Sequence, residues 1–190
     1  MSHLLSEFRL IRVSDTLVRV EGFFAAILAA IVTLLILLNI FSRTLGMALY
    51  WVDEMAIYAM VWMCFISTSM ILKKRQSVAV TILSEYLGKT NRQRLEKFSD
   101  VMVLVFALLM LVLCFKWYDP INVIAANFDL QSFQANTFNF IYAEKTNTLE
   151  LKKFWIWLVI PIFSLSLTVH ALNNLIHGLE PTNDESGDRV

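Results

Sequence analysis

Residues Gly22–Phe41 read GFFAAILAAIVTLLILLNIF, a stretch of 20 residues without Asp, Glu, Lys or Arg. Three further stretches lack all four residue types: Met55–Leu72, Val101–Phe115 and Phe154–Ile176. The shortest extends through Lys116, whose ammonium can reach the headgroup layer. Because a helix needs about 20 residues to cross the hydrocarbon layer, the sequence predicts an all-α integral membrane protein with four transmembrane helices.

The predicted spans are about 22–41, 55–72, 101–118 and 154–176. With 190 residues and a mean hydropathy of +0.61, the chain has room for one membrane domain, residues 1–190. Its 16 basic and 16 acidic residues cancel, so no basic excess indicates a nucleic-acid partner. Carriers usually place ionisable groups at membrane depth, and their near absence here predicts a protein that does not carry a polar solute alone.

The distribution of positive charge predicts the orientation in the bilayer. Four spans place both termini on one side, together with the loop between the second and third spans. That side holds 11 Lys and Arg residues and the other side holds 5. The positive-inside rule therefore predicts that the N- and C-termini both lie inside.

Three segments outside the spans carry further signals. Residues 4–20 and 77–88 mix apolar and polar residues at helical spacing and predict short interfacial amphipathic helices. The outer loop, residues 119–153, is long for a connection, and its five aromatic residues argue against pure disorder. This loop is predicted to be a functional surface on the outer side.

The second span opens on two carboxylates, Asp53 and Glu54. One interpretation is that they complement the positive end of the helix dipole at a wet interface. The other is an assembly role, in which one of them pairs with Arg43 or with a cation of a partner. The aromatic residues Trp51, Tyr58 and Trp62 fall near one face of the same helix and favour packing against another protein.

Residues that often bind cofactors are few. Cys64 and Cys114 lie in different spans and are predicted to be packing residues. His170 and His177 lie seven residues apart on one face of the fourth span, the pattern of haem ligands in membrane anchors. A hydrogen-bonded histidine is the stronger interpretation of His170, because a second histidine at matching depth is missing. No cofactor, metal or catalytic residue is predicted.

Several of these elements together resemble a known family. The run Asn39-Ile40-Phe41-Ser42-Arg43, the run Trp51–Tyr58, Trp62 and the basic cluster Lys73-Lys74-Arg75 are similar to the small (Q-type) membrane subunit of TRAP (tripartite ATP-independent periplasmic) transporters. That family has an Arg closing the first helix, a Trp-x-(Glu/Asp)-Glu element opening the second, and basic residues at its end. Two features depart from the family. Ser77 and Thr81 stand where it often has His and Asp, and the loop 119–153 looks like an insertion.

The resemblance implies a scaffold subunit, not an enzyme, in a bacterial inner membrane. Such subunits pair with a large membrane subunit that carries the sodium and substrate sites. A periplasmic binding protein delivers the substrate, commonly a C4-dicarboxylate or a sialic acid. We expect the structural and partner-contacting residues to be Arg43, Trp51, Asp53, Glu54, Tyr58 and Trp62. The docking surface for the binding protein is expected in the outer loop, at Phe128, Phe133, Phe138 and Tyr142.

Two other functions stay open at this point. A membrane anchor of a redox enzyme would show a Soret band that depends on His170. A free-standing small carrier would move solute in liposomes containing this chain alone. The lack of charge within the spans counts against the carrier.

Overall fold

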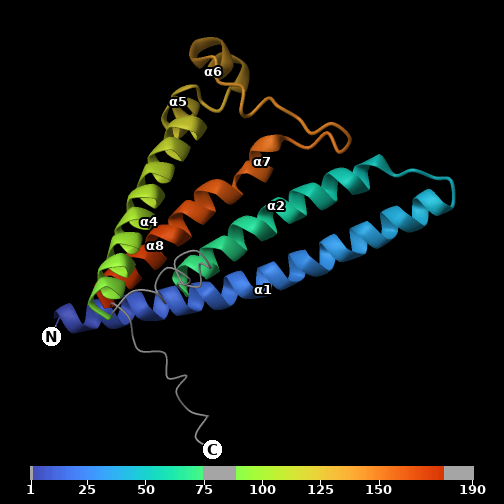
Figure 1. Cartoon of the computed structure of the whole chain (residues 1–190). Coiled ribbons are helices and arrows are strands. Elements are labelled where there is room, and N and C mark those ends of the chain that lie inside the picture. The colour runs from blue at the N-terminus through green and yellow to red at the C-terminus, as the bar shows by residue number, and fades with distance from the viewer. Residues whose placement is uncertain (1, 75–88, 178–190) are drawn as a thin grey trace, which may run out of the picture.

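The computed structural model describes residues 2–74 and 89–177, and the described part is built from helices (Figure 1). Four of them are long and apolar enough to cross a membrane, as the sequence predicts. They are α1 (Ser2–Thr44), α2 (Tyr50–Lys73), α4 (Lys89–Tyr118) and α8 (Val159–His177), the last preceded by the short α7 (Lys153–Trp157). Two short helices, α5 (Pro120–Ala125) and α6 (Leu130–Thr137), lie in the outer loop.

Two predictions about the segments beside the spans had different outcomes. Residues 4–20 do not form a separate interfacial helix, because they continue into the first span within α1. No proline interrupts this stretch, and Gly22 does not end the helix. A Cβ atom at Gly22 would lie 3.3 Å from Cε of Met70, so this glycine permits close packing of α1 on α2. The predicted helix 77–88 lies outside the described residues.

The four spanning helices form two antiparallel pairs. α1 packs along α2, α4 packs along α8, and α8 also contacts both α1 and α2. In Figure 1 the inner ends of the helices converge, whereas the outer ends of α1 and α2 diverge from that of α4. α8 is therefore the central helix of the fold, since it contacts the other three spanning helices.

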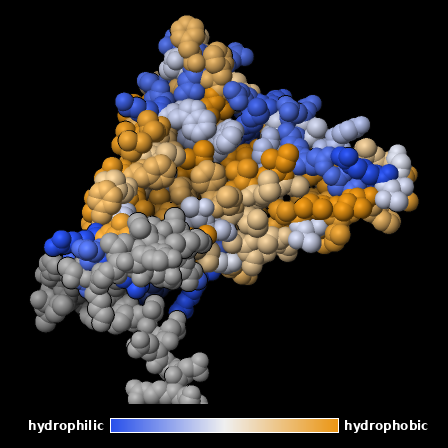
Figure 2. All heavy atoms as spheres, in the orientation of Figure 1, coloured by the Kyte–Doolittle hydropathy of each residue, from blue (hydrophilic) through white to orange (hydrophobic). Residues whose placement is uncertain are grey.

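The small apolar core lies where α2, α4 and α8 meet. Ala107, Phe163 and Leu167 are buried there, and the rings of Phe65 and Phe163 meet edge to face at 5.2 Å. Most other large apolar side chains point outward, as expected for helices that face lipid or a partner. Figure 2 shows this apolar surface over the helix bodies, with hydrophilic residues along the outer loops.

The fourth span is interrupted where the sequence contains a proline. α7 ends at Trp157 and α8 begins at Val159, with Leu158 between them. Pro161 has no N–H group to donate to the carbonyl of Trp157, so the helical hydrogen-bond ladder cannot continue there. Pro161 thus accounts for the break between these two helices.

Candidate functional site

The outer ends of α1 and α2 are joined by a polar triad of Asn39, Arg43 and Asp53. Nη2 of Arg43 lies 2.7 Å from Oδ2 of Asp53, and Nε of Arg43 donates to Oδ1 of Asn39 at 2.9 Å. Asn39 in turn donates to the other carboxylate oxygen of Asp53. Of the two interpretations of the carboxylates, Asp53 therefore fits the one in which a carboxylate pairs with Arg43. A tight turn makes the approach possible, with Gly46 at φ 78°.

The neighbouring carboxylate, Glu54, binds a segment distant in sequence. The chain folds back on itself over residues 144–152, here called the outer strap. Within the strap the amide of Thr146 donates to the carbonyl of Leu151 at 2.8 Å, and beyond it the amide of Lys153 donates to Glu144 at 2.9 Å. These bonds hold the strap in a shape that presents its backbone N–H groups to α2.

Three consecutive amides of the outer strap donate to Glu54. The distances are 2.8 Å from Asn147, 2.7 Å from Thr148 and 3.2 Å from Leu149. The hydroxyl of Thr148 also donates to Oε2, and the hydroxyl of Tyr58 donates to Oε1 at 3.0 Å. A carboxylate has only acceptor sites, and here five donors surround it. Glu54 therefore fixes the loop between the third and fourth spans onto α2.

Trp62 provides a second link between α2 and the fourth span. Its indole N–H donates to the carbonyl of Ile156 at 2.9 Å, next to the break between α7 and α8. The predicted partner-contacting residues Arg43, Asp53, Glu54, Tyr58 and Trp62 are thus all engaged in contacts within the chain. Trp51 differs from them, because it is exposed and no hydrogen bond to its side chain is found in the described part. Their role in binding a partner stays a prediction.

The outer loop has its own aromatic core. Tyr142 packs against Phe133, Tyr118 and Phe154, with ring centroids 5.3 to 6.3 Å apart. Phe133 is 1% exposed, and the hydroxyl of Tyr142 donates to the carbonyl of Tyr118 at 2.6 Å. Burial raises the pKa of Tyr142 above its usual value of 10.0. Two of the four predicted docking residues, Phe133 and Tyr142, therefore hold the loop together.

The other two predicted docking residues lie on the loop surface. Phe128 is 72% exposed and Phe138 is 80% exposed. They flank α6, whose first turn is capped by Asp129. The side chain of Ser132 donates to Asp129 at 2.6 Å and, with the Gln131 amide, holds the pKa of that carboxyl below 3.8. A capped helix thus presents both phenyl rings to the outside.

A third polar group lies among the inner halves of the helices and was not predicted. We call it the inner polar cluster, and it joins three helices: α1, α2 and α8. Its members are Ser14, Glu21, Ser69, Ser166 and His170, and all five are buried.

The hydrogen bonds of the inner polar cluster form one chain, with Glu21 in its middle. Ser69 lies 3.0 Å from Ser166, which donates to Oε1 of Glu21. On the other side, Oγ of Ser14 lies 2.8 Å from Nδ1 of His170, and Nε2 of His170 lies 3.2 Å from Oε2 of Glu21. Since the carboxylate only accepts, Nε2–H donates to it, and Nδ1 of a neutral ring accepts from Ser14. Every polar group of the cluster is thereby satisfied.

The inner polar cluster adds a buried carboxylate, Glu21, to helices in which the sequence shows almost no ionisable groups at membrane depth. Glu21 directly precedes the first charge-free stretch, and a carboxylate at the end of a span can reach water. It is instead 8% exposed and packed on α8. The helical spacing held the only signal: Ser166 and His170 are four residues apart, and Ser14 and Glu21 are seven apart, so each pair shares a helix face.

The same cluster bears on the alternative of a redox anchor. Both ring nitrogens of His170 are in hydrogen bonds, and the ring is fully buried. A haem ligand would need one of these nitrogens for the iron. The expectation of a hydrogen-bonded histidine is therefore the one that the structure fits.

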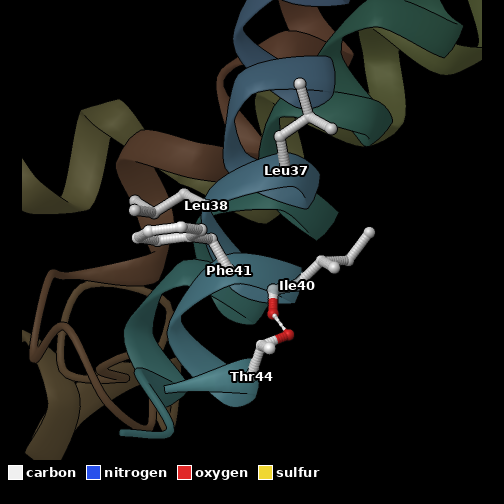
Figure 3. A pocket seen from close by; sticks show the side chains of 5 residues that line it. All are labelled: Leu37, Leu38, Ile40, Phe41 and Thr44. Atoms are coloured by element: carbon white, nitrogen blue, oxygen red, sulfur yellow. Dashed lines mark hydrogen bonds between the residues drawn. The ribbon is translucent and has the colours of Figure 1, made fainter.

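Two recesses in the surface are apolar. One, of about 610 Å³, lies between α1, α2 and α8 and is polar only near its inner end, at Glu21, Ser69 and Ser166. The other lies at the outer end of α1, where Leu38 and Phe41 lie side by side (Figure 3). Its lining contains no charged group. Neither recess offers cations that would hold an organic acid.

The sequence of the chain was then compared with known proteins. The sequence model of the family described as "Tripartite ATP-independent periplasmic transporters, DctQ component" matches residues 32–180. The chain belongs to this family. No curated protein and no solved structure matched it. As a DctQ component, it is a transport subunit of the inner membrane, in agreement with its four spanning helices.

The region matched to the DctQ family contains both outer contacts but only part of the inner one. Arg43, Asp53 and Glu54 all fall within residues 32–180. Of the inner polar cluster, Ser14 and Glu21 lie before residue 32, whereas the members on α2 and α8 lie inside the match. In this DctQ component, the inner polar cluster therefore depends on a part of α1 outside the matched region.

Proposed function

We propose that this chain is the non-catalytic scaffold of a tripartite transporter. In this proposal it supports the large membrane subunit during sodium-coupled uptake of an organic acid, of the sialic acid or C4-dicarboxylate type. A periplasmic binding protein delivers that acid. Membership of the DctQ component family supports the partners, since the family is one part of a three-part system.

One structural observation carries the proposal of a scaffold. In the described part of the chain, polar contacts between helices gather at two levels, the outer triad with the Glu54 contact and the inner polar cluster. Between these levels the helices meet mainly through apolar side chains such as Phe65, Phe163 and Leu167, and the indole of Trp62 adds one polar link, to the carbonyl of Ile156. A polar solute needs binding groups along its whole path. An apolar body fixed at both ends suits a support better than a carrier.

Transport assays in liposomes test this proposal directly. Liposomes containing this chain, the large subunit and the binding protein are expected to accumulate the organic acid under an inward sodium gradient. Liposomes with this chain alone are expected to accumulate none, and the large subunit alone should retain less than about a tenth of the complete activity, because it lacks its support. Sodium-driven accumulation by this chain alone would contradict the scaffold role.

The exposed phenyl rings of the outer loop are the proposed contact for the binding protein. Replacing both Phe128 and Phe138 by Ser should weaken binding of that protein to the membrane complex by about tenfold, since buried aromatic side chains dominate such interfaces. Surface plasmon resonance on the complex in nanodiscs measures this affinity.

A matched control separates a docking role from damage to the loop. Gln131 and Asn136 are exposed on α6 between the two rings, and replacing both by Ser should leave the affinity unchanged. Equal affinity of the wild type and the Phe128→Ser, Phe138→Ser variant would remove these residues from the docking surface.

A further inference from the structure

A small basic pocket lies at the inner end of the seam between α1 and α2. It measures about 300 Å³ and is lined by Asp15, Val18 and Arg19 of α1 and by Lys73 and Lys74 of α2. Three cations therefore face one carboxylate. Figure 1 shows that this seam continues outward along α2.

Among the described residues, one of the three cations has an ion-pair partner. Nζ of Lys73 lies 3.6 Å from Oδ1 of Asp15, and the side chain of Lys73 is 15% exposed. Arg19 and Lys74 are exposed and make no ion pair within the described residues. Within the described part of the chain the pocket therefore has two positive charges without an ion-pair partner, and one of them is a guanidinium, which binds phosphate through two parallel hydrogen bonds.

The surface becomes apolar directly outward from the pocket. On α1, Phe23, Ala26 and Ala30 follow Arg19 at spacings of four, seven and eleven residues, and all are exposed. On α2, the exposed Ile71 lies one turn before Lys74. A ligand that fits this surface has an anionic head and a long apolar tail. Free phosphate or a soluble anion would leave the apolar part without a partner.

We propose that this pocket binds an anionic phospholipid of the inner leaflet. Its phosphate lies between Arg19 and Lys74, and one acyl chain lies along Phe23. Basic pockets between spanning helices on the cytoplasmic side suit such headgroups. The lipid then joins the inner ends of α1 and α2, as the triad of Asn39, Arg43 and Asp53 joins their outer ends. This site goes beyond the scaffold role and does not depend on it.

Native mass spectrometry of the full chain tests the proposal. The protein is titrated with phosphatidylglycerol or with phosphatidylcholine, and the bound lipid is counted. Phosphatidylglycerol is expected to bind at least about tenfold more tightly. The Arg19→Gln, Lys74→Gln double variant should lose about 25-fold in that affinity, at about fivefold per charge. Equal affinity for the two lipids would overturn the proposal.

Three controls make the result specific. Replacing Arg94 and Lys97, two exposed cations of α4, by Gln should leave the affinity for phosphatidylglycerol unchanged. An equal loss of affinity in that variant would show that binding depends on the total positive charge and not on this pocket, and would overturn the proposal. Soluble glycerol phosphate should bind far more weakly than the lipid, and equal binding would identify an anion site instead.

The last control is a variant that should bind phosphatidylglycerol more tightly. Its result does not depend on whether the double variant folds correctly. Asp15→Asn releases Lys73 from its ion pair and removes the negative charge of the pocket, so the net charge of the pocket rises by one. It should tighten phosphatidylglycerol binding by about fivefold. If Asp15→Asn leaves the affinity unchanged or lowers it, the pocket is not the lipid site.

Discussion

Replacing Glu54 by Ala is expected to lower sodium-driven uptake by the complete transporter by about tenfold or more. The carboxylate accepts from three backbone amides of the outer strap and from two hydroxyls, and among the described residues no other hydrogen bond or ion pair joins α2 to the strap. Without it, the loop between the third and fourth spans loses its attachment to α2. Uptake in liposomes and hydrogen exchange at Asn147–Leu149 measure the two effects.

Two variants show whether the effect belongs to the carboxylate. Glu54→Gln keeps the size of the side chain but replaces one acceptor by an NH₂ group that faces donors, so it should behave nearly as Ala does. Glu150→Ala removes an exposed carboxylate of the same strap and should retain normal uptake. Unchanged amide exchange in Glu54→Ala would show that the strap is held by other contacts.

The second large effect is expected at the inner polar cluster. Glu21→Ala should destabilise the chain by about 3 kcal/mol, because it leaves His170 and Ser166 buried without their acceptor. His170→Ala should cost a similar amount, since it removes a donor from a buried carboxylate. Thermal unfolding in detergent, followed by circular dichroism, measures both.

A double-mutant cycle separates the interaction from simple loss of volume. Because the two residues form one hydrogen-bonded unit, the Glu21→Ala, His170→Ala variant should be less destabilised than the sum of the single variants. Thr33→Ala is the control on α1, since its hydroxyl bonds only to the carbonyl of Ala29 in the same helix. Strictly additive losses would mean that Glu21 and His170 act independently.

The main features of the fold can be predicted from patterns of residues that lie close together in the sequence. Four charge-free stretches are enough to predict the four spanning helices, and the excess of Lys and Arg on one side gives an orientation that stays a prediction. The link between Arg43 and Asp53 was also accessible, because a short turn separates the residues and their charges are opposite. Such features depend on neighbours in the chain, which sequence reasoning handles well.

The contacts that join the two helix pairs are between residues far apart in the sequence. Glu54 meets amides more than 90 residues later, and Glu21 meets His170 across 149 residues. No spacing rule connects residues so far apart. The donors at Glu54 are mostly backbone N–H groups, which every residue except proline possesses, so no residue type marks the site. The prediction that residues 4–20 form a separate helix was wrong because only a change in amphipathic pattern, and no helix breaker, marks the boundary.

Because the helices converge at their inner ends, a small tilt of α1 about its inner part gives a larger displacement of its outer end. From Glu21, where it is fastened to α8, to Thr44 the helix extends by about 35 Å. A tilt of about 5° around that fastening would move the far end by about 3 Å. A tilt that hardly changes the contacts at the converging inner ends thus produces a displacement of several ångströms where α1 meets the outer turn. The buried contacts of Glu21 at one end and the outer triad of Asn39, Arg43 and Asp53 at the other therefore act together to hold α1 in place.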